Sequence, residues 1–380
     1  MNRRNGGHLA YLDGLRGIAI AMVVMVHVGQ RIAGMPAPIR DFTFYGVRGV
    51  QLFFIVSGFT LTMAHLGKPL NLANFAARRF FRIAPMFYVG ACLYLGLAAI
   101  PALDPAFNPQ GVTWGAIALT ASFLHGWSLQ SYNLVVPGGW SIADEAMFYC
   151  VFPLLLLTLG NRRGYGALLV AIYVLAGGCY FALRRFVPGD PRIVQGFAVS
   201  FWLCNLPAFA TGCWLALKPG VKALDGKARL VLVLAALGLV ADSQLRGHGN
   251  LLLSIMILSA LVWAVDRAPP AWLSGRFMTH LGEISFSLYL LHFAVLKVLL
   301  PVIRRAEAAL GWAVTLPLAY VATIALAGLL AHFTYNYVER PFIRAGRKAF
   351  AGSRTTAETP LSPPPPDEAA PSLQPAKQPG

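Results

Sequence analysis

The chain has 380 residues, of which 57% are hydrophobic and only 12% are charged. An ordinary soluble domain carries roughly 25% charged residues, because water must solvate its surface. This composition excludes a water-soluble globular protein and indicates a chain whose surface is solvated by lipid. The 31 Lys and Arg residues outnumber the 15 Asp and Glu residues, which gives a formal net charge of +16. These cations are scattered between apolar runs, so they indicate membrane topology and argue against a nucleic-acid-binding surface.

Long apolar runs define the fold class. A transmembrane helix needs about 20 predominantly apolar residues. Ten stretches qualify: 15–33, 48–66, 84–101, 144–160, 165–183, 197–217, 229–245, 250–266, 281–302 and 313–335. The sequence therefore predicts an all-α polytopic membrane bundle of about ten transmembrane helices. The five cysteines show no paired short spacing, so neither a metal site nor a disulfide framework is expected.

The distribution of arginines predicts the topology. Clusters at 3–4, 78–82 and 162–163 fall on the cytoplasmic side by the positive-inside tendency, which requires an even number of crossings between them. The apolar stretch 112–124, of about 13 residues, then cannot cross and is expected to be re-entrant or interfacial. We expect both termini in the cytoplasm and the chain in the inner (plasma) membrane, although the pairs 184–185 and 304–305 fall outside and oppose this assignment.

The C-terminal composition changes to Pro, Ser, Thr and Ala from about Ala351. Such a segment cannot bury a core. We expect a membrane domain over 1–346 and a disordered Pro-rich cytoplasmic tail over 347–380. Because no soluble catalytic domain stands beside the bundle, any chemistry is expected within the bundle itself.

Polar residues inside apolar runs are the informative positions, because a charge near the bilayer centre costs roughly 2.5–3.5 kcal/mol and usually serves a function. Arg16 and His27 are separated by about 1100° of helical rotation, only about 20° past three turns, so they share one face. With Arg16 at the cytoplasmic boundary, His27 is expected near the midplane. A neutral histidine there could accept a proton from a hydroxyl. The alternative is a buried histidine bonded to a neighbouring carbonyl.

Two further segments carry candidate ligand-binding residues. Arg79 and Arg82 stand three residues apart on one helix face, where two guanidinium groups could hold phosphate oxygens or simply anchor the helix. Ser57, followed by Gly58, fits close helix packing or a cavity lining. No base stands near Ser57 in the sequence, which argues against a nucleophile.

The segment from Trp140 to Tyr149 enters an apolar helix with several polar side chains. Ser141 and Asp144 have the spacing of a helix cap, whereas Glu145 has no capping duty and shares a face with Tyr149. Glu145 could therefore orient His27 or stabilise its protonated form. His292 is a second histidine inside an apolar run, either bonded in the core or lining a cavity. Glu339 and Arg340 close the last run and could pair with each other.

These residues follow one another in an order that resembles the acyltransferase-3 family of integral membrane acyltransferases. The resemblance covers nearly all of the chain before the Pro-rich tail. Six blocks carry the resemblance: 12–17 followed by His27, 52–59, 79–82, Trp140-Ser141 with Glu145 and Phe148-Tyr149, 285–289 with His292, and 339–342. Any one block would be weak, but six in order make a specific match.

The resemblance implies transfer of an acyl group, usually acetyl from cytoplasmic acetyl-CoA, to a hydroxyl of an extracytoplasmic glycan or lipid-linked sugar. His27 and Glu145 then match the family's catalytic histidine and glutamate, and Arg79 and Arg82, with Arg16, match its donor-binding region. Trp140, Ser141, Tyr149, Ser57 and His292 are expected to line the acceptor site or cavity. No metal, no nucleic acid and no particular oligomeric state are implied, and membrane lipid is the expected surrounding.

Two other classes remain open from the sequence. A polytopic transporter of a glycan or small anionic solute would also bury polar residues, but it would more naturally show a two-half repeat, which is not seen. The second alternative class is a non-catalytic member of an envelope-assembly complex.

Overall fold

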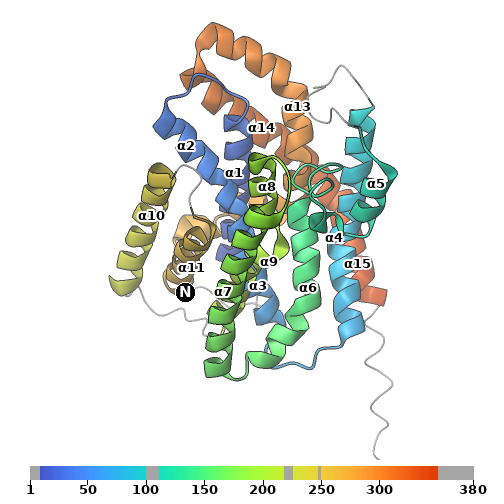
Figure 1. Cartoon of the computed structure of the whole chain (residues 1–380), viewed down its shortest axis with the longest axis vertical. Coiled ribbons are helices and arrows are strands. Elements are labelled where there is room, and N and C mark those ends of the chain that lie inside the picture. Colours follow the sequence, from blue (N-terminus) through green and yellow to red (C-terminus); the bar gives the residue numbers. More distant parts are fainter. Residues whose placement is uncertain (1–8, 100–110, 218–225, 247–249, 350–380) are drawn as a thin grey trace, which may run out of the picture.

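The computed structural model describes residues 9–99, 111–217, 226–246 and 250–349, and within these ranges every regular element is helical (Figure 1). The longer helices are α1 (Ala10–Gly29), α3 (Gly49–His65), α4 (Leu72–Ala98), α6 (Trp140–Thr158), α7 (Arg162–Phe186), α9 (Trp202–Leu215), α10 (Gly226–Arg246), α11 (Leu251–Arg267), α13 (Ser285–Leu310) and α14 (Trp312–Thr334). Shorter helices are α2 (Ala37–Tyr45), α5 (Trp114–Ala121), α8 (Pro191–Ser200), α12 (Arg276–Glu283) and α15 (Arg340–Ala349).

The predicted polytopic helical bundle is confirmed. Among the described residues, eight helical segments are long and apolar enough to cross a membrane: Ala10–Gly29, Ala37–His65, Leu72–Ala98, Trp140–Thr158, Arg163–Phe186, Pro191–Leu215, Ser285–Leu310 and Trp312–Ala349. The two remaining predicted spans form α10 and α11, which pack against each other. With 17 residues, α11 extends about 26 Å, slightly less than the hydrocarbon layer. Membrane crossing by α10 and α11 stays a prediction.

The short apolar stretch 112–124 does not form a spanning helix. Its helix, α5, has eight residues and therefore a length of only about 12 Å. Trp114 at its start is 86% exposed, and the backbone after it turns through a left-handed Phe123 into a 3₁₀ turn, His125–Trp127. The element fits the expected interfacial or re-entrant segment.

The boundaries of α1 differ from those of the predicted span. The helix begins at Ala10 and ends at Gly29, whereas the predicted span was 15–33. Arg16 consequently lies about 9 Å inside the helix, and His27 lies only two residues before its end. His27 thus lies near the end of α1, but its neighbour His292 is only seven residues after the start of the 26-residue α13, so its depth in the membrane stays a prediction. At the C-terminus, α15 includes 347–349, which were assigned to the tail, and 350–380 lie outside the described residues, as does the arginine pair at 3–4.

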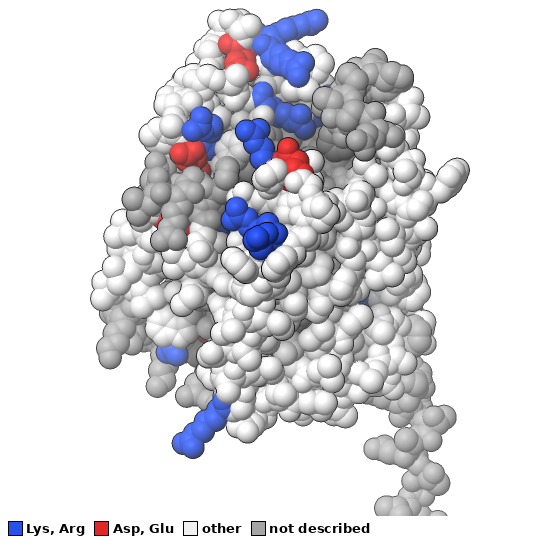
Figure 2. All heavy atoms as spheres, viewed as in Figure 1, with Lys and Arg blue, Asp and Glu red and all other residues white. Residues whose placement is uncertain are grey.

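The connections between helices mark the two ends of the bundle. Figure 1 shows the α3–α4 and α6–α7 connections at the lower end and the α13–α14 turn at the opposite end. Figure 2 shows Lys and Arg gathered on the upper part of the face in view, above a broad area without charged side chains. Such an uncharged belt suits contact with lipid.

α1 is central because it packs against α3, α12, α13 and α14. α3 and α9 approach so closely that glycine is required at their crossing. A Cβ atom at Gly58 would lie 2.2 Å from the Phe209 carbonyl oxygen, and one at Gly212 would lie 2.1 Å from the Ile55 carbonyl oxygen. Small residues allow this close approach in a membrane bundle, where packing rather than the hydrophobic effect holds helices together. The contact fixes α3, which carries Ser57 and Thr60.

We predict that Gly212→Ala lowers the thermal midpoint of the purified protein, with a loss of stability of roughly 1–3 kcal/mol from overpacking. Gly178→Ala, on α7, is the matched control because no neighbouring atom lies within 4 Å of the added Cβ. The control should leave the midpoint unchanged or raise it slightly, since alanine favours a helix. Equal behaviour of the two variants would contradict the close α3–α9 contact.

Candidate functional site

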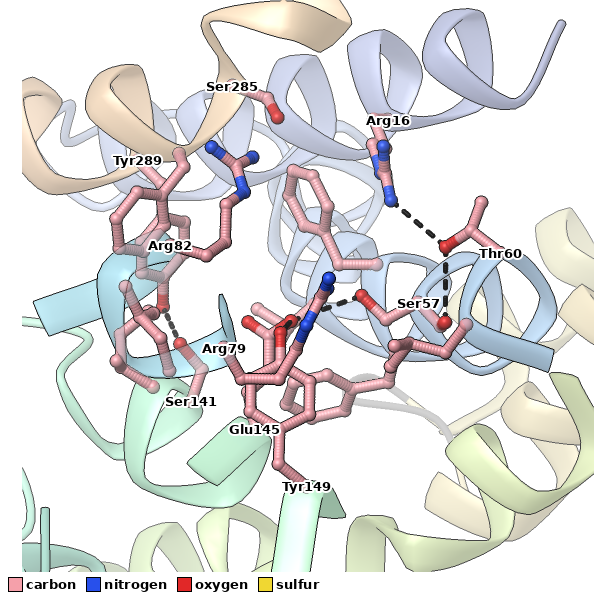
Figure 3. A pocket seen from close by; sticks show the side chains of 17 residues that line it. Arg16, Ser57, Thr60, Arg79, Arg82, Ser141, Glu145, Tyr149, Ser285 and Tyr289 are labelled. Atoms are coloured by element: carbon pink, nitrogen blue, oxygen red, sulfur yellow. Dashed lines mark hydrogen bonds between the residues drawn. The ribbon is translucent and has the colours of Figure 1, made fainter. Parts of the chain in front are cut away.

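A cavity of about 100 Å³ lies between α1, α3, α4, α6 and α13. It has space for several water molecules or a small acyl group. Figure 3 shows Arg16, Arg79 and Arg82 pointing toward this space, with Ser57 and Glu145 beside them. The lining residues are Arg16, Val50, Phe53, Phe54, Ser57, Thr60, Leu61, Arg79, Arg82, Ile83, Ser141, Ile142, Glu145, Tyr149, Ser285, Phe286 and Tyr289. The structure thus brings together seven of the ten predicted site residues.

A larger open basin of about 1020 Å³ adjoins the cavity. The two spaces share Arg16, Thr60, Leu61, Arg79 and Arg82 as lining residues, so the cavity lies at the floor of the basin. Lys68, in the α3–α4 turn, also lines the basin, which places its opening at the end that the charge pattern assigns to the cytoplasm. Eight Lys and Arg residues and only two acidic residues line it: Arg16, Lys68, Arg78, Arg79, Arg82, Arg340, Arg344 and Arg347, with Asp13 and Glu283. The basin is suited to a polyanion.

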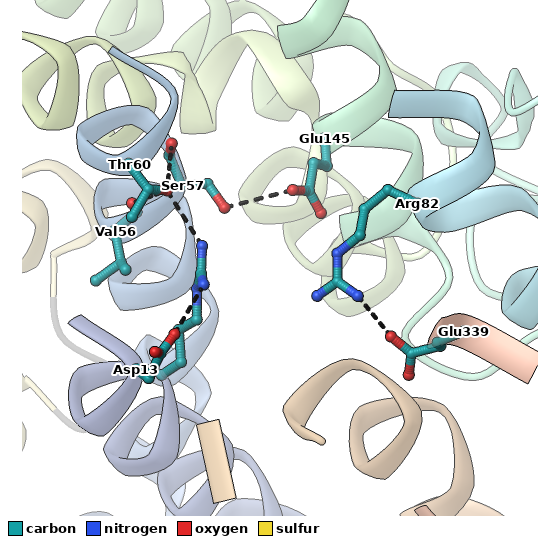
Figure 4. Close-up of polar contacts among 8 residues, drawn as sticks. Asp13, Val56, Ser57, Thr60, Arg82, Glu145 and Glu339 are labelled. Atoms are coloured by element: carbon teal, nitrogen blue, oxygen red, sulfur yellow. Dashed lines mark hydrogen bonds and ion pairs between the residues drawn. The ribbon is translucent and has the colours of Figure 1, made fainter. Parts of the chain in front are cut away.

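Arg82 is held by an ion pair that the sequence did not predict. Its Nη1 donates to the Glu339 carboxylate at 2.6 Å (Figure 4). Ser287 on α13 donates to the other carboxylate oxygen. Glu339 is 1% exposed and ends a π-helical turn, Tyr335–Glu339, between α14 and α15. The expected local pair of Glu339 with Arg340 is therefore wrong, since Arg340 faces the basin. The contact ties α4 to α13 and to the end of α14.

Arg16 is also paired. It donates to Asp13 at 3.2 Å and to the Thr60 hydroxyl at 3.1 Å, which connects α1 to α3 (Figure 4). Thr60 in turn donates to the Val56 carbonyl oxygen at 2.8 Å. These bonds fix the guanidinium at the boundary between basin and cavity.

Arg79 differs from the other two arginines of the cavity. Within the described chain no carboxylate lies in ion-pair range of it, and its buried Nε has no hydrogen-bond partner. Its guanidinium instead lies 5.9 Å from the Phe75 ring centroid and 5.7 Å from that of Tyr149. Cation–π contacts orient such a group but leave its hydrogen-bond donors available. Arg79 is therefore the cation of the cavity best placed to receive an external anion.

Glu145 belongs to this arginine-rich cavity and not to His27. Its carboxylate accepts hydrogen bonds from Tyr149 at 2.6 Å and from Ser57 at 3.3 Å. The suggested orientation of His27 by Glu145 is corrected by these contacts, because α6 delivers Glu145 to the side of the bundle that holds Arg16, whereas His27 lies at the opposite end of α1. Ser57, for which the sequence showed no nearby base, has a carboxylate within hydrogen-bond distance.

A set of hydrogen bonds at one wall of the cavity joins α6 to α13. The Ser141 hydroxyl donates to the Tyr289 hydroxyl at 2.8 Å (Figure 3). Tyr289 donates to the Gly138 carbonyl oxygen at 2.9 Å. Gly138 has φ of 73°, and a Cβ there would lie 2.7 Å from the Tyr289 hydroxyl, so both conformation and space require glycine. Trp140 does not line the cavity. Its ring packs edge-on against Phe54, a lining residue, with 6.4 Å between the two ring centroids.

His27 and His292 lie together beyond this wall. Their ring centroids are 5.3 Å apart, and the His292 ring is 5.8 Å from that of Tyr289. Nδ1 of His292 donates to the Tyr289 carbonyl oxygen at 2.7 Å, which leaves its buried Nε2 without a hydrogen-bond partner. Neither histidine lines the cavity or the basin.

Gln30 is the polar partner of His27. The Gln30 Oε1 lies 3.0 Å from Nδ1 of His27, one helical turn further along the chain. Because an amide oxygen only accepts, this bond places the ring proton on Nδ1 and leaves Nε2 as the basic nitrogen. Phe293 packs against the same ring, with centroids 4.3 Å apart. The sequence analysis missed Gln30, although its spacing of three residues from His27 was a usable signal.

Asp144 does not cap α6 as the sequence suggested. Its side chain is 1% exposed and accepts a hydrogen bond from Asn205 on α9 at 3.0 Å, and Asn205 accepts one from Gln51 on α3 at 2.9 Å. This buried network links α3, α6 and α9 behind the cavity. Among the described residues, no group of three or more His, Cys, Asp or Glu side chains is arranged to hold a metal ion.

Comparison with known proteins places this geometry in context. The model of the acyltransferase domain family matches residues 9–332. The O-acetyltransferase OatA of Staphylococcus aureus (strain NCTC 8325 / PS 47) is 23% identical over 385 aligned positions, which cover 90% of this chain and 58% of the relative. The putative O-acetyltransferase SACOL0978 of Staphylococcus aureus (strain COL) is 24% identical, over 89% of this chain and 58% of the relative. The chain thus spans less than two thirds of the length of these relatives. No solved structure matches it.

We predict that Glu339→Ala destabilises the protein by roughly 2–3 kcal/mol, because it leaves Arg82 and Ser287 without their shared partner. Glu283→Ala is the matched control. Glu283 lies at the same end of the bundle, but it is 48% exposed, and its one ion-pair contact, to a histidine nitrogen, is long at 3.8 Å. Thermal unfolding in one detergent compares the two variants. A midpoint for Glu339→Ala no lower than that of the control would contradict the structural role of this pair.

Proposed function

The chain belongs to the acyltransferase-3 family, and from this premise we propose that it is a membrane O-acyltransferase that moves acetyl from acetyl-CoA to a hydroxyl of an extracytoplasmic or lipid-linked glycan. The two relatives are named O-acetyltransferases, which supports acetyl as the group transferred. The membrane in this proposal is the inner (plasma) membrane, with both termini in the cytoplasm. The acceptor is identified only as a glycan hydroxyl.

The observation that carries the proposal is the connection between the basic basin and the smaller cavity that adjoins it. A CoA thioester carries its negative charges at one end and its reactive carbonyl at the other. The basin offers cations at the end assigned to the cytoplasm, and the cavity offers a small space lined by Arg79, Ser57 and Glu145. A donor entering from the cytoplasm would therefore place its phosphates in the basin and its acyl end in the cavity.

The three arginines of the cavity have different roles in this proposal. Arg79 contacts an anionic group of the donor, because no carboxylate holds it among the described residues. Arg16 and Arg82 are already bonded to Asp13 and Glu339, so their main effect is to hold the shape and the positive potential of the passage. The two phosphate-binding arginines expected from the sequence, Arg79 and Arg82, thus have different roles: Arg79 faces the ligand, and Arg82, like Arg16, is held by a carboxylate.

His27 acts as the base in this mechanism. Its Nε2 takes the proton of the acceptor hydroxyl while the hydroxyl oxygen attacks the thioester carbonyl carbon. The carbon–sulfur bond breaks, the CoA thiolate leaves and takes the proton, and an ester and free CoA result. In the competing route, His27 Nε2 attacks the thioester first and a transient acyl-histidine is then attacked by the hydroxyl. Both routes need Nε2 unprotonated, which the Nδ1–Gln30 contact supports.

The acyl group must pass from the cavity to His27. Tyr289 lines the cavity, its ring is 5.8 Å from His292, and His292 is 5.3 Å from His27. In the proposal this wall opens, with Tyr289 releasing Ser141 or Gly138, when the donor is bound. In this proposal Tyr289 and His292 stand between the donor cavity and the base.

We expect His27→Ala to abolish acceptor-dependent release of free CoA from acetyl-CoA, with a rate loss of about 10²-fold or more from removal of the base. The assay uses the full chain in membranes with envelope glycan as acceptor and detects the free thiol. His280→Ala, a surface histidine that is not part of the proposed site, should retain the wild-type rate. Acceptor-dependent release that survives His27→Ala would remove the proposed base, and transport of glycan without thiol release would favour a transporter.

We expect Gln30→Leu to lower kcat about tenfold while KM for acetyl-CoA stays unchanged, because the His27 ring loses its fixed tautomer but the donor site is untouched. Gln30→Glu keeps an oxygen acceptor for Nδ1–H and should restore most of the rate. Steady-state kinetics of the three proteins separate the two constants. A rise in KM with kcat unchanged, or failure of Gln30→Glu to restore the rate, contradicts a positioning role for Gln30.

A further inference from the structure

The basin contains a group of cations that the acyl-transfer chemistry does not use. Arg340, Arg344 and Arg347 come from α15, and Arg78 comes from the first turns of α4. All four side chains are exposed, and none forms an ion pair within the described chain. They lie at the outer part of the basin, because they line it and do not line the cavity.

α15 presents its arginines on one face. Positions 340, 344 and 347 follow the spacing of helical neighbours, and Ile343 between them lines the basin as well. Like charges at this spacing repel one another by roughly 0.2–0.5 kcal/mol per pair in a free helix. The arrangement is therefore unfavourable by itself, and a bound polyanion would offset it. Lys348, one helical turn after Arg344, does not line the basin.

α15 is also fixed in place. A Cβ atom at Gly346 would lie 2.8 Å from the Cβ of Phe81, so the helix backbone rests directly on α4. Immediately before α15, Glu339 is bonded to Arg82 of the same helix α4. Two contacts thus hold the arginine face toward the basin, which is the condition for a preorganised binding site rather than a mobile charged tail.

We propose that Arg344 and Arg347, assisted by Arg340 and Arg78, bind the 3′-phosphorylated ADP end of acyl-CoA. The inference rests on the proposed function, and it assigns the recognition of the nucleotide to α15. The basin volume of about 1020 Å³ suits a nucleotide-sized ligand. Guanidinium groups bind phosphate oxygens in fork geometry, and a 3′-phosphate and a pyrophosphate supply several such acceptors.

An anionic phospholipid headgroup offers similar phosphate chemistry. The nucleotide is favoured because the arginines face a concave basin that continues into the cavity, whereas a lipid-binding patch needs to face the bilayer surface. In addition, the basin is lined from α1, α3, α4, α12 and α15, with Tyr335 from the π-helical turn, so its walls enclose a ligand on several sides.

The test compares three donors with the wild-type chain and with Arg344→Gln/Arg347→Gln in nanodiscs of zwitterionic lipid. The donors are acetyl-CoA, acetyl-dephospho-CoA, which lacks the 3′-phosphate, and acetyl-phosphopantetheine, which lacks the nucleotide. We expect the double variant to raise KM for acetyl-CoA about tenfold, with kcat unchanged, and to leave KM for acetyl-phosphopantetheine unchanged. Wild type should prefer acetyl-CoA over both shorter donors, and the variant should lose most of that preference.

Two controls accompany the double variant. Lys348→Gln removes a cation of the same helix that does not line the basin, and it should leave every KM unchanged. Arg344→Lys/Arg347→Lys keeps the charge without the fork geometry and should give an intermediate KM. An equal rise in KM for all three donors, or no rise for acetyl-CoA, overturns the proposal. So does an effect that appears only when anionic phospholipid is added to the nanodiscs, because it assigns the arginines to lipid.

Direct binding of adenosine 3′,5′-bisphosphate keeps this inference separate from the proposed function. By calorimetry, wild type and Lys348→Gln should bind this nucleotide, and Arg344→Gln/Arg347→Gln should bind it at least tenfold more weakly. If no donor yields acyl transfer but this difference in binding is present, the proposed function fails and the nucleotide site stands. If acyl transfer occurs and the nucleotide binds all proteins equally, only the assignment to α15 is overturned.

Discussion

The ion pair between Arg82 and Glu339 is the contact on which the rest of the site depends. A guanidinium and a carboxylate are costly to place inside a membrane protein unless each satisfies the other. Here one carboxylate receives Arg82 from α4 and Ser287 from α13, so three segments distant in sequence are joined at one point. The π-helical turn that ends at Glu339 also sets where α15 begins. The shape of the cavity and the wall of the basin both follow from this arrangement.

A second constraint is the separation of charge from the histidine pair. The arginines, Glu145 and the basin occupy one end of the bundle, and His27 with His292 lies toward the other. Between them stands the hydrogen-bonded wall of Ser141 and Tyr289. This separation suits the proposed reaction, in which an anionic donor and a glycan acceptor approach from opposite sides of the membrane, because neither ligand then has to cross the whole bilayer.

The polar side chains of the bundle fall into two functional groups. Asp144, Asn205 and Gln51 bond to one another behind the cavity and join α3, α6 and α9. Tyr149 and Ser57, in contrast, direct their hydroxyls to Glu145 inside the cavity. Within a low-dielectric interior an unpaired polar group is expensive, so both sets stabilise the fold, but only the second is exposed to a ligand. The sequence assigned Asp144 to a helix cap and Glu145 to the site, but only the neighbouring helix α9 decided that Asp144 bonds to Asn205.

The sequence by itself determined the class of structure and the family, because apolar runs of about 20 residues and six ordered blocks are local properties of the chain. It also identified Arg16, Arg79, Arg82, Ser57, Ser141, Glu145 and Tyr149, which all line one cavity. Only the tertiary structure decided their partners: Glu339 for Arg82, Ser57 for Glu145, and Gln30 rather than Glu145 for His27. Helical periodicity reports which residues share a face, but the depth of a residue and the helix opposite it depend on where each helix begins and on how closely glycines such as Gly58 allow neighbours to approach.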